Sequence, residues 1–111
     1  MIRYTTPTNA LKVRGLDLSE YDVYVTFTQK PRGSRSETIL TVPATNIEFD
    51  GEDSDIQITL TQQQTAQFVE GPCSVQVNYI DVNGLRNATK KHTITVHDNL
   101  LKEVLSYGGQ Q

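Results

Sequence analysis

The densest group of residues that could do chemistry is an acidic segment around Gly51. Asp50, Glu52, Asp53 and Asp55 place their carboxylates close together in the sequence, and hard oxygen ligands of this kind suit calcium. The spacing falls short of the twelve-residue EF-hand loop, and no bidentate glutamate stands at its far end. Acidic turns are common at hairpin tips, where water solvates the repulsion between carboxylates. We therefore expect a solvated tip, with a bound cation as the alternative.

The histidines and the single cysteine do not form a catalytic or metal-binding set in the sequence. His92 and His97 are five residues apart, so on one strand they face opposite sides and cannot share a metal. Cys73 follows Pro72 and opens an alternating apolar run, which indicates a buried thiol rather than a nucleophile. Because no Ser, Thr or Cys stands in a Gly-flanked nucleophile elbow, we expect no enzyme activity, no catalytic residue and no cofactor.

One residue on a predicted strand is suited to contact a partner. Tyr24 has the opposite parity to Val23 and Val25, which places it on the wet face of the sheet. An outward tyrosine is either an interface anchor or the cross-strand neighbour of polar residues. Tyr24 is therefore a candidate partner-binding residue.

The C-terminal segment is the second candidate for partner binding. Its aliphatic residues stand at helical spacing behind Asp98 or Asn99 as a cap, and Gly108-Gly109 would end the helix; they are Leu100, Leu101, Val104 and Leu105. A lone helix this short is marginal in water, so it must dock. It would either cover the open end of its own sandwich or insert into a neighbouring subunit.

These candidates are positioned by short segments in which apolar and polar residues alternate, as in strands with one buried face. Ile56, Ile58 and Leu60 point inward in the clearest of them, and Thr61 with Gln64 then forms a capping box that begins a helical turn. The predicted strands are an interrupted first strand at 2–5 and 11–16, followed by 22–29, 37–42, 46–50, 55–61, 73–79 and 91–97. We expect 22–29 with 37–42, 46–50 with 55–61, and 73–79 with 91–97 to pair as antiparallel neighbours.

Length and composition favour a single all-β domain. The 111 residues suffice for one core, and about seven strands indicate a small antiparallel β-sandwich, Ig-like or jelly-roll-like, over 1–98 with a C-terminal helix or tail over 99–111. The net charge of −3 argues against nucleic-acid binding. The sequence contains neither a signal-peptide pattern nor an apolar run long enough for a membrane span, so we expect synthesis in a cytoplasm and no membrane.

The order of these features resembles that of a known group of proteins. The segments that carry the resemblance are Gly15–Ser19, Val23–Phe27, Ile58–Phe68, Gly71-Pro72, Val75–Val77, Asn83-Gly84 and Ile94–Val96. Together they resemble the small β-sandwich domains of tailed-phage virion proteins, notably the N-terminal domain of the baseplate upper protein family and related head-fibre or fibre-base proteins. The resemblance covers roughly residues 11–98 and rests on the order of these segments along the chain, not on an invariant motif.

The resemblance implies a non-enzymatic virion protein, made in the host cytoplasm, that serves as an oligomeric attachment platform. Its partners would be capsid, fibre or tail components at the head surface, connector or baseplate, and a dimer or trimer is expected. The alternative is a carbohydrate- or peptide-binding module that uses Tyr24 and the acidic loop at 50–55.

Overall fold

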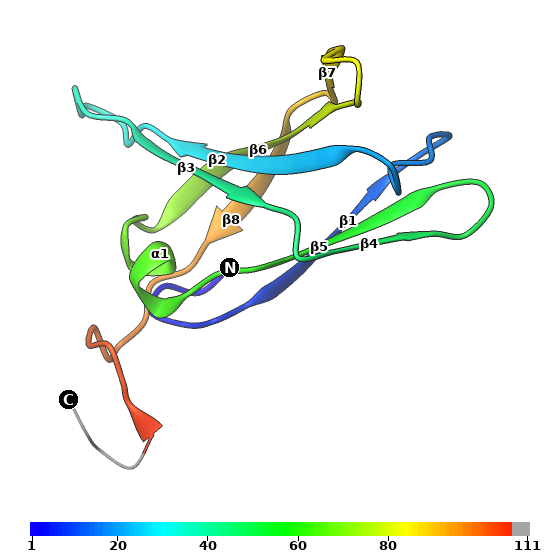
Figure 1. The fold of residues 1–111 in the computed structure, drawn as a ribbon. Helices are drawn as coiled ribbons and strands as arrows, with labels where there is room; N and C mark the ends of the chain where they lie inside the picture. Colours follow the sequence, from blue (N-terminus) through cyan, green and yellow to red (C-terminus); the bar gives the residue numbers. More distant parts are fainter. Residues whose placement is uncertain (108–111) are drawn as a thin grey trace.

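The computed structural model describes residues 1–107 and contains two antiparallel sheets packed together as a small β-sandwich (Figure 1). One sheet has the order β1-β5-β4; the other has the order β3-β2-β6-β7, and β8 also pairs with β6. The strands are β1 Thr8–Val13, β2 Asp22–Gln29, β3 Thr38–Pro43, β4 Asn46–Phe49, β5 Ser54–Thr59, β6 Gly71–Ile80, β7 Arg86–Ala88 and β8 His92–Val96. The predicted all-β sandwich is confirmed.

The three predicted antiparallel strand pairs are confirmed. β2 pairs with β3, β4 pairs with β5, and β8 lies beside β6. The sequence did not reveal β7, which pairs with the C-terminal end of β6 before β8 pairs with its beginning. Between them the Thr89 N–H donates to the Val77 carbonyl at 2.9 Å, and the Thr89 hydroxyl accepts from the Val77 N–H at 3.2 Å. This residue therefore divides the returning strand in two.

The first strand differs from the prediction. Thr8 and Asn9, which lie in the predicted interruption between 2–5 and 11–16, open β1 and pair with Thr59 and Ile58 of β5. Ile2 makes only an isolated bridge with His97. Pro and Asn favour turns locally, but the long-range ladder with β5 overrides that preference, as tertiary context commonly does.

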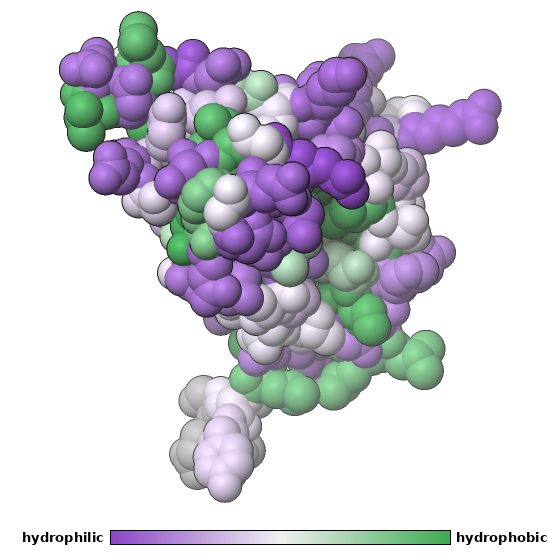
Figure 2. Space-filling model, turned by 90° about the vertical axis from the view of Figure 1, so that its right-hand side faces the viewer, coloured by the Kyte–Doolittle hydropathy of each residue, from purple (hydrophilic) through white to green (hydrophobic). Residues whose placement is uncertain are grey.

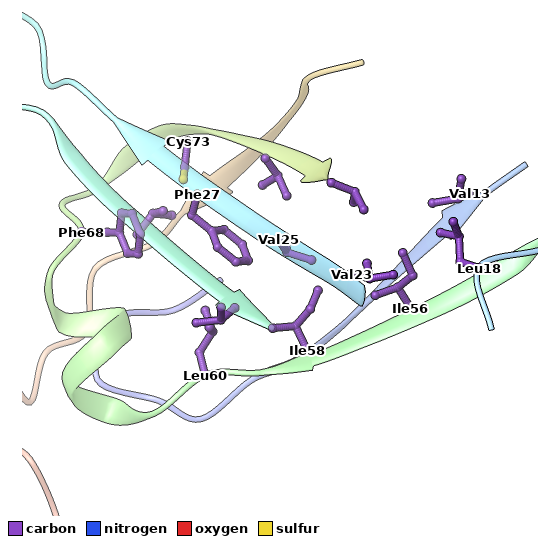
Figure 3. Close-up of a cluster of buried hydrophobic side chains, with 14 residues drawn as sticks. Val13, Leu18, Val23, Val25, Phe27, Ile56, Ile58, Leu60, Phe68 and Cys73 are labelled. Atoms are coloured by element: carbon purple, nitrogen blue, oxygen red, sulfur yellow. The ribbon is translucent and has the colours of Figure 1, made fainter. Parts of the chain in front are cut away.

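The core lies between the sheets (Figure 3). Ile56, Ile58 and Leu60 are each 0% exposed, which confirms their inward orientation. The Phe27 and Phe68 rings pack edge to face with centroids 6.3 Å apart, a favoured aromatic geometry. The strand alternation recognised in the sequence therefore produces one continuous apolar layer.

The helical turn forms where the capping box predicted it. α1 spans Gln62–Ala66, and the Gln64 N–H donates to the Thr61 hydroxyl at 3.1 Å while the Thr61 N–H donates to the Gln64 Oε1 at 2.9 Å. These two bonds satisfy donors that a helix start leaves free. The fully buried Thr65 hydroxyl donates to the Thr5 carbonyl at 2.9 Å and so ties α1 to the N-terminal segment.

Of the predicted C-terminal helix or tail, the described residues form a tail, and the helix is wrong for them. The chain from 99 to 107 forms no α-helix and extends beyond α1, away from the sandwich (Figure 1). The Asn99 side chain accepts from the Leu101 N–H at 3.1 Å, as a helix cap would, but a helix of this length gains little by itself. Gly108-Gly109 lies outside the described residues. Within 1–107 no helix is long and apolar enough to cross a membrane.

Candidate functional site

The tail, defined here as residues 99–107, is held to its own sandwich by a pair of hydrogen bonds. The Gln62 Nε2 donates to the Leu105 carbonyl at 2.9 Å, and the Leu105 N–H donates to the Gln62 Oε1 at 2.8 Å. A glutamine amide presents a donor and an acceptor side by side, so it pairs with a backbone residue much as a neighbouring strand would. We call this pair the Gln62 clamp.

A second anchor holds the start of the tail. The Arg3 guanidinium donates to the Asp98 carboxylate and to the Ala66 carbonyl, each at 3.0 Å, and Asp98 also pairs with Lys102 at 3.1 Å. The hydrogen bond from Arg3 and then that from Lys102 lower the pKa of the Asp98 carboxyl. The Asn99 amide donates to the Arg3 carbonyl at 3.1 Å. The tail therefore follows a defined path.

The aliphatic side chains of the tail nevertheless point largely into solvent. Leu100 is 105% exposed, Leu101 47% and Leu105 53%, whereas Val104 is partly buried. Tyr107, which was not among the predicted binding residues, is 105% exposed. Figure 2 shows apolar surface gathered at the lower end of the molecule, where this segment lies. The polar groups of the tail therefore bond to the sandwich of the same chain, while its apolar side chains remain exposed to a partner.

The outer face of the five-stranded sheet contains a shallow pocket around Tyr24. Tyr24 is 42% exposed, as predicted, and pairs across the sheet with Pro43 and Asn78. The pocket has a volume of about 310 Å³, at the lower end of the roughly 300–1,000 Å³ usual for small-molecule sites. Arg86 donates to the Asn78 Oδ1 through Nε at 3.3 Å and Nη2 at 3.1 Å. An aromatic ring and polar groups thus lie together on this face.

The acidic segment forms the turn between β4 and β5, as predicted. Its carboxylates already accept bonds from the backbone: Asp50 from the N–H groups of Asp53 at 2.7 Å and Glu52 at 2.9 Å, and Asp53 from that of Gly15 at 2.9 Å. The two backbone bonds lower the pKa of the Asp50 carboxyl. This turn belongs to the other sheet from Tyr24, so the structure does not join the two halves of the predicted carbohydrate-binding surface.

The residues considered for catalysis and metal binding lie apart. Cys73 is 1% exposed, as expected for a structural thiol, and burial raises the pKa of its thiol, which disfavours the reactive thiolate. His92 borders a groove between the sheets, whereas the His97 backbone bonds Met1 and Arg3. Residues 1–107 contain no group of three or more side chains placed to hold a metal ion.

The groove beside His92 was not found from the sequence. It opens between the edge of β1 and the strands β6 and β8, has a volume of about 250 Å³, and is lined by Ala10, Leu11, Lys12, Val13, Val75, Val77, Thr89 and His92. The lining residues come from both sheets, so only knowledge of how the sheets pack could bring them together. No alternation or motif within either segment signals this juxtaposition.

Comparisons with known proteins add no assignment. No protein-family model matches the chain, and no curated protein or solved structure matches it.

Proposed function

We propose that this protein is a non-enzymatic structural protein of a tailed-phage virion, an oligomeric platform that attaches neighbouring virion proteins through its tail. The observation that carries the proposal is the contrast within the tail. Its backbone and polar side chains are bonded to the sandwich, whereas Leu100, Leu101, Leu105 and Tyr107 remain exposed. Contiguous exposed apolar side chains on a folded protein commonly mark an interaction site.

The energetics support attachment through this segment. Full burial of an exposed leucine contributes about 1.5–3 kcal/mol, so three leucines would contribute several kcal/mol before ordering costs. Those costs fall when a segment is already ordered before binding. Since the Arg3–Asp98 pair and the bond from Asn99 to the Arg3 carbonyl already order the start of the tail in the free chain, association carries a smaller ordering cost.

The sandwich architecture and the ordered sequence pattern described above support the virion assignment. In that setting the sandwich would position the tail, and partners would be capsid, fibre or tail components. The work of such a protein requires surfaces rather than reactive groups, in agreement with the buried Cys73 and its raised thiol pKa.

The test is incorporation into particles. A tagged full-length chain is expressed during assembly of the virions of its source, and purified particles are assayed for the tag. We expect the wild-type chain in the particles and its loss when Leu100, Leu101 and Leu105 are all changed to Ser. A matched control changes the exposed Ile39 and Val82, which lie outside the tail, to Ser. Retention of the tail variant, or absence of the wild-type chain from particles, would contradict the proposal.

The second candidate function is binding of a carbohydrate or peptide, and the pocket around Tyr24 favours it. A half-exposed tyrosine offers a stacking face, while the Thr26 and Thr41 hydroxyls, 2.9 Å apart, and Arg86 offer hydrogen bonds beside it. Such an apolar surface with a few polar groups is typical of ligand sites. Binding on a glycan array that is lost in Tyr24→Ala and kept in Tyr107→Ala would support it. A calcium-dependent rise in melting temperature would indicate a separate cation site at the acidic turn. If the glycan array shows no binding and calcium does not change the melting temperature, this candidate is removed.

A further inference from the structure

β1 has an unpaired edge that faces the groove between the sheets. In the ladder with β5, the Leu60 N–H donates to the Pro7 carbonyl at 3.1 Å, and antiparallel pairs alternate between hydrogen-bonded and non-bonded positions. Pro7, Asn9, Leu11 and Val13 therefore direct their backbone carbonyls, and their N–H groups where present, toward β5. Thr8, Ala10 and Lys12 direct theirs to the opposite side, where β1 has no partner strand among the described residues.

The side chains in the groove are mainly apolar. Leu11 and Val13 of β1 and the buried Val75 and Val77 of β6 line it, together with Lys12 and His92. Its volume of about 250 Å³ is below the roughly 300–1,000 Å³ of small-molecule sites. An open strand edge beside such a floor suits an extended segment, which adds backbone bonds along the edge and places alternate side chains in the groove.

The tail has the properties that this groove requires. It is non-helical and its leucines are exposed. In an extended chain Glu103 shares the face of Leu101 and Leu105 and can meet Lys12 at the groove, whereas Lys102 lies on the opposite face. The tail of the same chain is directed elsewhere. β8 begins at the groove with His92 and leads away to Val96, after which the tail is clamped at α1 by Gln62. The tail of the same chain would have to turn back along β8 to reach the groove, whereas the tail of a second copy can approach it from outside.

We propose that the tail of a second copy adds to the free edge of β1 and places Leu101 and Leu105, which share one face of an extended chain, in the groove, and that the exchange is reciprocal in a two-fold dimer. The proposal rests on the proposed function in that the tail is the attaching segment; in the exchanged dimer Leu100, on the opposite face of the extended tail, stays exposed for other virion proteins. The two equivalent contacts close the assembly, as two-fold symmetry requires. Release of the Gln62 clamp accompanies the exchange, because the tail must leave its own α1.

Cross-linking between two variants tests the contact directly. Full-length Ala10→Cys and Leu105→Cys chains are mixed and treated with a bis-maleimide; the natural Cys73 is buried and gives little background. We expect a heterodimer. The matched control replaces Ala10→Cys with Ile39→Cys on the free edge of β3, and its yield should be several-fold lower. Cross-linking no stronger than this control would overturn the proposal, as would a doubly substituted chain that links only within itself.

A proline substitution tests the edge bonds. Because the Ala10 N–H faces away from β5, Ala10→Pro removes a donor from the free edge and leaves the β1–β5 ladder intact. Light scattering should give twice the 12.4 kDa chain mass for the wild type and a monomer for Ala10→Pro. Ile39→Pro, whose N–H also faces away from its partner strand, should remain a dimer. A monomeric wild type, or an Ala10→Pro variant that remains dimeric, would overturn the proposal. If Ala10→Pro does not fold by circular dichroism, the cross-linking result decides.

The failure of this proposal and that of the virion function give different results. A monomeric chain whose tail variant is lost from particles would refute the exchange and leave the function standing. A cross-linked dimer whose tail variant is still incorporated would refute attachment to the virion through the tail and leave the exchange standing.

Discussion

The Gln62 clamp leads to a prediction about how readily the tail is released. In Gln62→Ala the tail loses both bonds to Leu105, at 2.9 and 2.8 Å. Alanine is the best helix former, so α1 itself should not be weakened. The neighbouring Gln63 is exposed and has no side-chain hydrogen bond within residues 1–107. Gln63→Ala is therefore a matched control with the same change of side chain on the same turn.

The magnitude follows from the two bonds. A net hydrogen bond contributes about 0.5–1.5 kcal/mol, and the lower value applies to these because water competes at the surface. Their loss should make release of the tail easier by about 1 kcal/mol, which is roughly fivefold in the equilibrium constant. If the clamped tail is the competing state of the exchanged dimer, two clamps are released per dimer, so the apparent dimer dissociation constant should fall by about the square of this factor, roughly 25-fold.

Amide hydrogen exchange measured by NMR is the assay. The Leu105 N–H should exchange roughly fivefold faster in Gln62→Ala than in the wild type if exchange follows tail opening, with no change in Gln63→Ala. Sedimentation of the same samples gives the dimer constant. Equal exchange at Leu105 in all three proteins would refute the clamp, and faster exchange with weaker association would refute its competition with the dimer.

Three further predictions concern the stability of the fold and tail. Gln29 is 4% exposed, and its side-chain amide donates to the Val69 carbonyl at 2.7 Å and accepts from the Val69 N–H at 2.8 Å. Gln29→Leu leaves both Val69 groups unpaired and should lower the free energy of unfolding, measured in urea, by about 2–3 kcal/mol. A decrease below about 0.5 kcal/mol, as at an ordinary surface site, would contradict this prediction. Thr61→Ala removes the α1 cap and should lower the free energy of unfolding by about 1 kcal/mol, with Thr61→Ser as the control that restores it. The pKa of Asp98 is lowered in the folded state, so its contribution is present above the unfolded pKa of about 3.9 and is lost as pH falls through the folded value. The protection factor of the Leu101 amide, which corrects for the intrinsic pH dependence of exchange, should fall in acid, and the same pH profile of protection in Asp98→Asn would exclude this carboxyl as the cause.

Much of the fold could be predicted because the relevant signals are local. Alternation identified the buried faces of β2, β5 and β6, and the Thr61–Gln64 pair located the start of α1. The interrupted first strand was predicted wrongly because turn propensity at 6–9 says nothing of β5, the partner that extends β1 to Thr8. β7 was missed because it is short and fully exposed, and only its ladder with β6 defines it.

The features of the candidate site also separate into those that depend on local sequence and those that depend on tertiary structure. The sequence alone determined which residues of the tail are apolar and that Tyr24 faces outward, because side-chain type and strand parity are local properties. Only the tertiary structure decided the form of the tail, because so short a helix is marginal without tertiary contacts, and the backbone of Leu105 instead bonds Gln62, which lies 43 positions away in the chain. The groove beside the free edge of β1 is likewise a property of two sheets meeting. Its lining comes from segments that approach each other only when the core between the sheets closes.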